Sequence, residues 1–168
     1  TIIVPLFISS ISITKNVNTF DAQQLEVNEI TFLNGVDSVK NLSAKKINVH
    51  TLNSDIQFSH VNGEEVVVEK QVKSASLVTT IPAQTAMNVQ FADENKIKTL
   101  TVVNADVVID ASNDTTITKL IAPNAAQITL SHAIDQIAVN RNVTIKGSGI
   151  IKQLELLSTS IVVTLSND

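Results

Sequence analysis

The sequence predicts an all-β protein in which one chain winds into a β-solenoid, similar to a parallel β-helix of stacked short coils. A hydrophobic phrase runs from Ile97 to Asn104 and returns from Ile117 to Asn124, a period of about twenty residues that is typical of repeat folds. A short alternating run follows each phrase, as at Val107/Ile109 and Ile128/Leu130. The chain is 43% apolar but only 3% aromatic, so its core must consist of aliphatic, largely β-branched side chains, which favour strands. The alternative is an antiparallel β-sandwich or jelly roll with the same strands.

Residues 1–16 are expected to form an N-terminal extended strand. Pro5 cannot donate to a central ladder, so this strand should lie at a sheet edge. An apolar edge needs a cover, and a neighbouring subunit would supply one by strand exchange. The residues predicted to make this contact are Ile2, Ile3, Val4, Leu6, Phe7 and Ile8.

Residues 17–96 are predicted to be a less regular β-rich part that precedes the regular coils. Asn62-Gly63 lies between two strand-like runs, and such a pair is a strong signal for a tight hairpin. The sequence therefore predicts a hairpin near residues 56–69, which would project from the solenoid or close one of its ends.

Residues 97–168 are predicted to form the regular solenoid coils. After the two clear phrases, a damaged copy begins at Ile137, and a further copy begins at Ile151 and includes Leu154 and Leu156. Roughly eight coils over the whole chain, about 4.8 Å apart, would give a rod about 40 Å long.

Asparagines recur just after the first strand of each phrase. Asn enters the left-handed backbone region more readily than other non-glycine residues, and stacked amide side chains can form hydrogen bonds between neighbouring coils. A corner ladder of Asn104, Asn124 and Asn140 is therefore expected. The alternative is that these residues are ordinary turn positions of a sandwich.

Composition argues against several functional classes. The net charge is −4, and no Lys/Arg run is longer than two residues, so nucleic-acid binding is not expected. The chain has no cysteine, which excludes disulfides and thiol catalysis. The apolar opening, residues 1–10, is too short to cross a bilayer, so no membrane span is expected.

No catalytic, metal or cofactor site is predicted, and the chain is not expected to be an enzyme. The three histidines, His50, His60 and His132, have no metal-ligand spacing. Asp106 and Asp110 would share one face of a strand, where paired acids could bind Ca²⁺ or act as general acid and base, as in some β-helix polysaccharide enzymes. A solvated polar face is the preferred interpretation.

The segment Asn142–Gly149 and the run from Ile151 to Leu154 resemble short β-solenoid repeats of secreted and cell-surface proteins of Gram-positive bacteria. The resemblance covers residues 97–168. It implies an extracellular or cell-surface location and a role as a module of an envelope, adhesin or fibre, and it assigns no functional residue.

The leading functional hypothesis is a structural protein that associates with itself head to tail into a fibre or surface layer. A solenoid has two ends with unpaired strand edges, and an apolar run continues almost to the last residue. The assembly residues predicted at this end are Ile161, Val163 and Leu165. The second hypothesis is an adhesin module that binds polysaccharide or a host surface, and the third is a β-helix carbohydrate enzyme.

Overall fold

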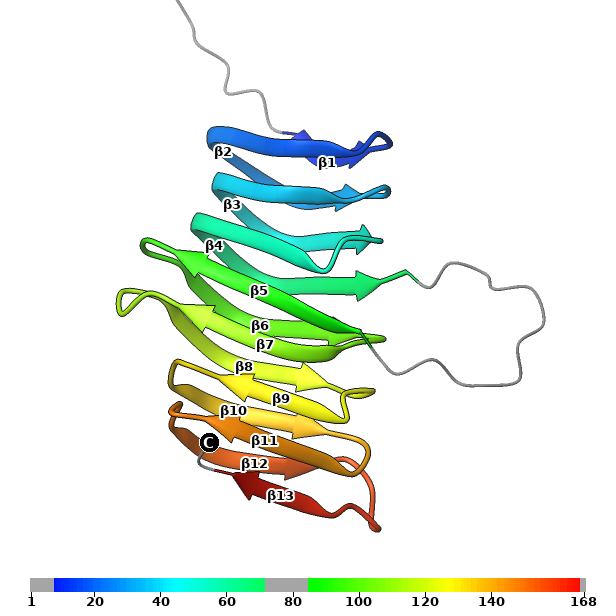
Figure 1. Cartoon of the computed structure of the whole chain (residues 1–168). Helices are drawn as coiled ribbons and strands as arrows, with labels where there is room; N and C mark the ends of the chain where they lie inside the picture. The colour runs from blue at the N-terminus through cyan, green and yellow to red at the C-terminus, as the bar shows by residue number, and fades with distance from the viewer. Residues whose placement is uncertain (1–7, 72–84, 167–168) are drawn as a thin grey trace, which may run out of the picture.

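The computed structural model describes residues 8–71 and 85–166 of the chain, which form thirteen strands and no helix (Figure 1). The strands are β1 (Ile8–Ile13), β2 (Val17–Phe32), β3 (Val36–Thr51), β4 (Asp55–Lys70), β5 (Ala86–Ala92), β6 (Lys96–Val103), β7 (Asp106–Ala111), β8 (Thr116–Ala122), β9 (Gln127–Leu130), β10 (Ile134–Val139), β11 (Val143–Gly147), β12 (Ile151–Leu156) and β13 (Val163–Ser166).

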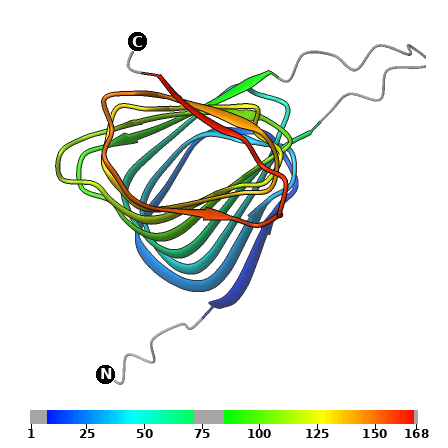
Figure 2. The ribbon, with the colours of Figure 1, turned by 90° about the horizontal axis from the view of Figure 1, so that it is seen from below.

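The chain is a β-solenoid, as the sequence predicts. Every pairing between described strands is parallel, which excludes the antiparallel sandwich or jelly roll. One ladder, here called sheet A, stacks β1, the C-terminal halves of β2, β3 and β4, and then β6, β8, β10 and β12. The other ladder, sheet B, stacks the N-terminal halves of β2 to β4 and then β5, β7, β9, β11 and β13. Viewed along the axis, the coils lie over one another around a shared interior (Figure 2).

The register of the coils follows the hydrophobic phrases. Leu100 pairs with Leu120, as the repeat requires. Ile137 pairs with Leu120, which is the fourth residue of its phrase. The damaged copy therefore begins three residues earlier than expected, at Ile134 and not at Ile137. This coil is three residues shorter than the one before it, and the alignment by period alone therefore missed its first residue.

Long strands pass from sheet B to sheet A without interruption. At this corner β3 and β4 each contain one residue with a positive φ, Asn41 at 54° and His60 at 53°. Asp93, at 60°, turns the corresponding corner between β5 and β6. A single left-handed residue is enough to redirect a strand, and the neighbouring residues remain in the ladder.

The predicted hairpin near residues 56–69 is wrong. Asn62 and Gly63 lie inside β4, where they pair in parallel with β3 on one side and β6 on the other. The glycine serves packing here, because a Cβ at Gly63 would come within 2.8 Å of Val66 Cγ2. The Asn-Gly pair therefore reflects a crowded interior and not a turn with positive φ.

The interior is filled by columns of stacked aliphatic side chains. In sheet A one fully buried column contains Ile30, Ile47, Val66, Leu100 and Leu120. Burying each side chain of this size stabilises the fold by about 1.5–3 kcal/mol. Aromatic rings appear in the N-terminal and central coils, where Phe58 stacks on Phe91 with 5.3 Å between the ring centroids.

Candidate functional site

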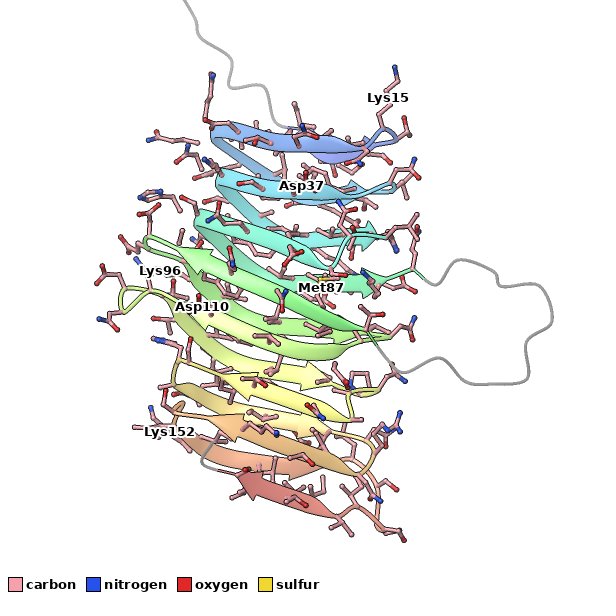
Figure 3. The ribbon with its side chains drawn as sticks, viewed as in Figure 1. Lys15, Asp37, Met87, Lys96, Asp110 and Lys152 are labelled. Carbon is pink, nitrogen blue, oxygen red and sulfur yellow. The ribbon has the colours of Figure 1, made fainter. Side chains whose placement is uncertain are left out.

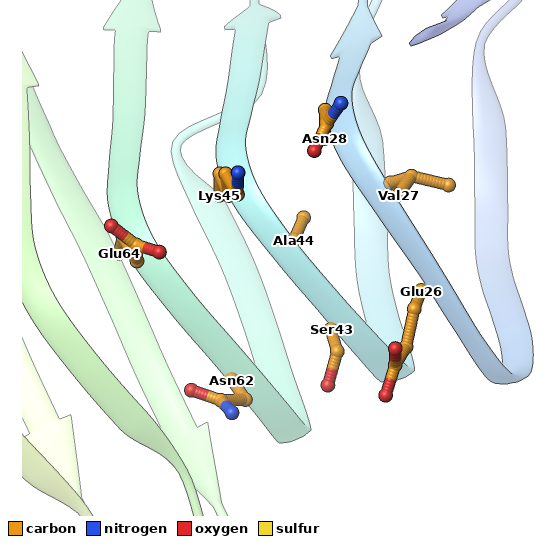
Figure 4. Close-up of a pocket in the computed structure, with 8 residues that line it drawn as sticks. All are labelled: Glu26, Val27, Asn28, Ser43, Ala44, Lys45, Asn62 and Glu64. Atoms are coloured by element: carbon orange, nitrogen blue, oxygen red, sulfur yellow. The ribbon is translucent and has the colours of Figure 1, made fainter. Parts of the chain in front are cut away.

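A polar groove runs along the solenoid on the outer side of sheet A (Figure 4). Two adjoining hollows of about 520 Å³ and 320 Å³ share Asn62 and Glu64, and so they form one continuous surface feature, here called the axial groove. Its walls are two rows of side chains from successive coils, with Val27 and Ala44 between them. The rows are Glu26, Ser43, Asn62, Lys96 and Thr116, and Asn28, Lys45, Glu64, Lys98 and Thr118.

The groove is straight because its walls follow the register of the sheet. Glu26 pairs with Ser43, which pairs with Asn62, and the same row continues through Lys96 to Thr116. Each step is one rung of about 4.8 Å. The lining side chains project outward, as Lys96 does in Figure 3.

Acidic and basic groups alternate along the groove. Lys96 Nζ lies 2.7 Å from Glu94 Oε1 at its margin. This hydrogen bond, together with the charge of Glu94, raises the pKa of Lys96 above its ordinary value of 10.5. The same contact lowers the pKa of Glu94. Both groups are therefore ionised at neutral pH, and they largely neutralise one another.

The C-terminal coil presents a second candidate surface, here called the end face. Of the eight large hydrophobic side chains that are exposed in the described part of the chain, six lie between residues 150 and 165. These six are Ile150, Leu154, Leu156, Leu157, Val162 and Leu165. Leu154 and Leu156 hold interior positions, since they pair with the buried residues Ile137 and Val139.

The predicted assembly residues that the structure describes lie at the two ends of the described solenoid. Ile8 belongs to β1 and pairs with Val27, whereas Ile2, Ile3, Val4, Leu6 and Phe7 lie outside the described residues. Val163 pairs with Val143, and Leu165 pairs with Ile145 while remaining 70% exposed. Ile161 precedes β13 and is partly buried against the core.

Two of the three asparagines expected in a corner ladder lie together. Asn104 has a φ of 63°, and its backbone N–H donates to Asn124 Oδ1 at 3.4 Å. Asn140 does not align with Asn124. Val139 pairs with Ala122, and this register places Arg141, the residue after Asn140, opposite Asn124. Arg141 Nη1 donates to the Asn124 carbonyl oxygen at 3.2 Å.

A more deeply buried corner asparagine, Asn95, was not predicted from the sequence. Its Oδ1 accepts a hydrogen bond from the Val61 N–H at 3.0 Å, and its Nδ2 donates to the Ala92 carbonyl and to Thr115 Oγ1. Asn95 precedes a hydrophobic phrase, whereas the expected corner ladder consists of asparagines that follow one. The spacing from Asn95 to Thr115 equals the repeat, and this was the available signal.

The aspartates considered for catalysis bind the neighbouring coil. Asp106 Oδ1 accepts hydrogen bonds from the N–H groups of Ala126 and Gln127 at 2.7 and 3.0 Å. Asp110 Oδ1 accepts one from Ser131 Oγ at 3.0 Å. These contacts join successive turns of the solenoid.

The histidines do not converge. His50 Nδ1 lies 2.8 Å from Glu69 Oε2, and His60 Nδ1 lies 3.9 Å from Asp93 Oδ2. No group of three or more potential metal ligands is present among residues 8–71 and 85–166. In these same ranges no helix has the length and apolar character needed to cross a bilayer.

Lys70 is a buried basic group at the end of β4. Its Nζ donates to the Leu52 carbonyl at 2.8 Å and to Ser54 Oγ at 2.9 Å. Burial lowers the pKa of Lys70, although the nearby charge of Asp55 opposes this effect. Both acceptors lie in the segment between β3 and β4, so the lysine fastens this segment to the next coil.

Comparisons with protein-family models, curated proteins and solved structures found no match to the chain. The two surfaces, the axial groove and the end face, therefore carry the functional argument.

Proposed function

We propose that this protein is a structural module that associates with itself head to tail, so that solenoids stack into a fibre or surface layer. The observation that carries the proposal is the end face, where interior positions of the last described coil are open to solvent. Leu154 is 37% and Leu156 is 48% exposed, whereas their partners one coil earlier are fully buried. Exposed apolar patches of this kind are typical of interaction sites.

The first coil of a second copy has the right side chains to cover this face. In sheet A, Ile8, Ile11 and Ile13 of β1 begin the same three columns that end at Ile151, Leu154 and Leu156 of β12. If β1 of one copy followed β12 of another, each column would continue from one molecule into the next. The backbone ladder would also continue, because β1 and β12 each have one partner among the described strands.

Electrostatics do not oppose such a junction. Outward positions of β12 would meet the uncharged Ser10 and Ser12 of β1. Glu155, the acidic residue on this side of β12, is paired with Lys119 at 2.8 Å and accepts a hydrogen bond from Gln136. A head-to-tail contact that does not close on itself produces filaments.

We place the assembly outside the cell or at the cell surface. The support is the resemblance of residues 142–154 to repeats of secreted and surface proteins. Surface labelling of intact cells that produce the protein, compared with labelling of lysed cells, tests the location.

Sedimentation velocity over a concentration series tests the association. The unaltered protein should sediment as a growing series of oligomers, and electron microscopy should show rods one solenoid wide. Leu156→Asp should shift the population to monomers, because a carboxylate would be buried without a partner in the junction.

Leu52→Asp is the matched control, because Leu52 is 49% exposed but lies between β3 and β4, away from the end face. Circular dichroism should show the same β-sheet content in all three proteins. A protein that stays monomeric at every concentration would overturn the proposal, as would oligomers that Leu156→Asp leaves unchanged.

A further inference from the structure

The axial groove is a second surface whose chemistry points to a ligand, and it is independent of the end face. It extends from β2 to β8, so four rung steps give a straight path of about 20 Å. A ligand that fills this path must be extended and unbranched, and it must lie along the solenoid axis.

Both wall rows of the groove consist of polar side chains, whereas the floor between them contains Val27, Ala44 and Ile97. Carboxylates, amides, hydroxyls and ammonium groups face the path, and no aromatic side chain lines either hollow. An apolar peptide would contact this floor, but it would also remove water from the charged wall rows without offering them hydrogen bonds. A peptide strand would also find no free backbone edge, because β2, β3, β4, β6 and β8 pair with one another along this surface.

The charges of the groove are mixed. Glu26 and Glu64 alternate with Lys45 and Lys98, and Lys96 is neutralised by Glu94 at 2.7 Å. A polyanion would meet the two carboxylates, and a polycation would meet the lysines. A polymer of uniform charge is therefore disfavoured in either case.

We propose that the axial groove binds a segment of a neutral, extended polysaccharide. Hydroxyl groups both donate and accept hydrogen bonds. The hydroxyls along a polysaccharide can therefore pair with the carboxylates, amides and ammonium groups that successive strands place along the groove. Without aromatic stacking the affinity is weak for each sugar, in the range between micromolar and millimolar dissociation constants.

Amide chemical-shift titrations test the assignment with three probes: cellohexaose, which is straight and neutral; maltohexaose, which is neutral but curved; and hexagalacturonate, which is anionic. Cellohexaose should shift the amides of the two wall rows, whereas maltohexaose should bind several-fold more weakly. The assignment is overturned if no probe shifts the groove residues at millimolar concentration, or if hexagalacturonate binds more tightly than both neutral chains.

Asn62→Ala should weaken cellohexaose binding about fivefold, as expected for the loss of one hydrogen bond. The control is Gln90→Ala on β5 of sheet B, which is also exposed and should leave binding unchanged. Equal effects of the two substitutions would contradict the groove as the site. Leu156→Asp protein should bind cellohexaose as the unaltered protein does, so a failure of self-association leaves this result intact.

Discussion

At the scale of single residues, buried polar side chains at the corners hold successive coils together. Asn95 is only 1% exposed and connects three segments, whereas the half-buried Asp106 and the exposed Asp110 connect neighbouring turns. A buried donor that loses its partner costs more than an exposed one, because water cannot replace the bond. The corners should therefore differ in their contribution to stability.

Asn95→Ala should lower the free energy of unfolding by about 2 kcal/mol or more, since the Val61 N–H would remain buried without an acceptor. Asn104→Ala should cost about 1 kcal/mol, because it loses mainly the preference of Asn for a positive φ. Urea unfolding followed by circular dichroism measures both values. Equal losses of unfolding free energy for the two substitutions would contradict the claim that burial makes Asn95 the more stabilising residue.

Sequence reasoning at this scale found the residue type but not every position. Asn104 and Asn124 were identified because they follow a phrase with a regular period. Asn140 was assigned to the same column, but a shortened coil moves it out of step. Asn95 was missed because burial of an amide is decided by contacts with Val61 and Thr115, which a single strand does not reveal.

At the scale of strands, glycines permit close approach between coils. Gly147 has a φ of 100°, and a Cβ there would overlap the backbone carbonyl of Leu130 in the coil before it. A Cβ at Gly63 would come too close to one side-chain atom, Val66 Cγ2, and not to any backbone atom. The two positions therefore look alike in sequence but impose different constraints.

Gly147→Ala should destabilise the protein by about 2–3 kcal/mol, because both the backbone conformation and the space are unsuitable. Gly63→Ala should cost less, about 1–2 kcal/mol, since the added methyl group conflicts with one side-chain atom of Val66 and not with the backbone. Thermal unfolding of both variants provides the comparison. A larger loss for Gly63→Ala would contradict this order.

Strand periodicity was sufficient to predict the solenoid and the neighbouring positions of Leu100 and Leu120. It was not sufficient at Asn62-Gly63, where a turn signal lies inside a continuous strand. Local sequence cannot distinguish a glycine selected for a turn from one selected for packing between two other coils. The axial groove was also not predicted, because its walls consist of single polar residues separated by a whole coil.

At the scale of the whole molecule, the solenoid has a polar lateral surface and an apolar end. The same register that aligns the walls of the groove aligns the columns that reach Ile151, Leu154 and Leu156. If a second copy continued these columns, its groove would lie parallel to the same solenoid axis as the groove of the first copy. The proposed lateral binding and the proposed axial stacking would use different surfaces, so they are compatible.

The most direct test of the account places one pyrene label on each end of the solenoid. The chain has no cysteine, so Ser10→Cys and Gln153→Cys variants can each be labelled at a single, exposed, outward site. In the proposed junction, these two sites share one column and lie one rung apart, at about 4.8 Å. An equal mixture of the two labelled proteins should show excimer fluorescence that increases with concentration, whereas either protein alone should not. Excimer emission from the Gln153→Cys protein alone, or none from the mixture at any concentration, would contradict head-to-tail stacking.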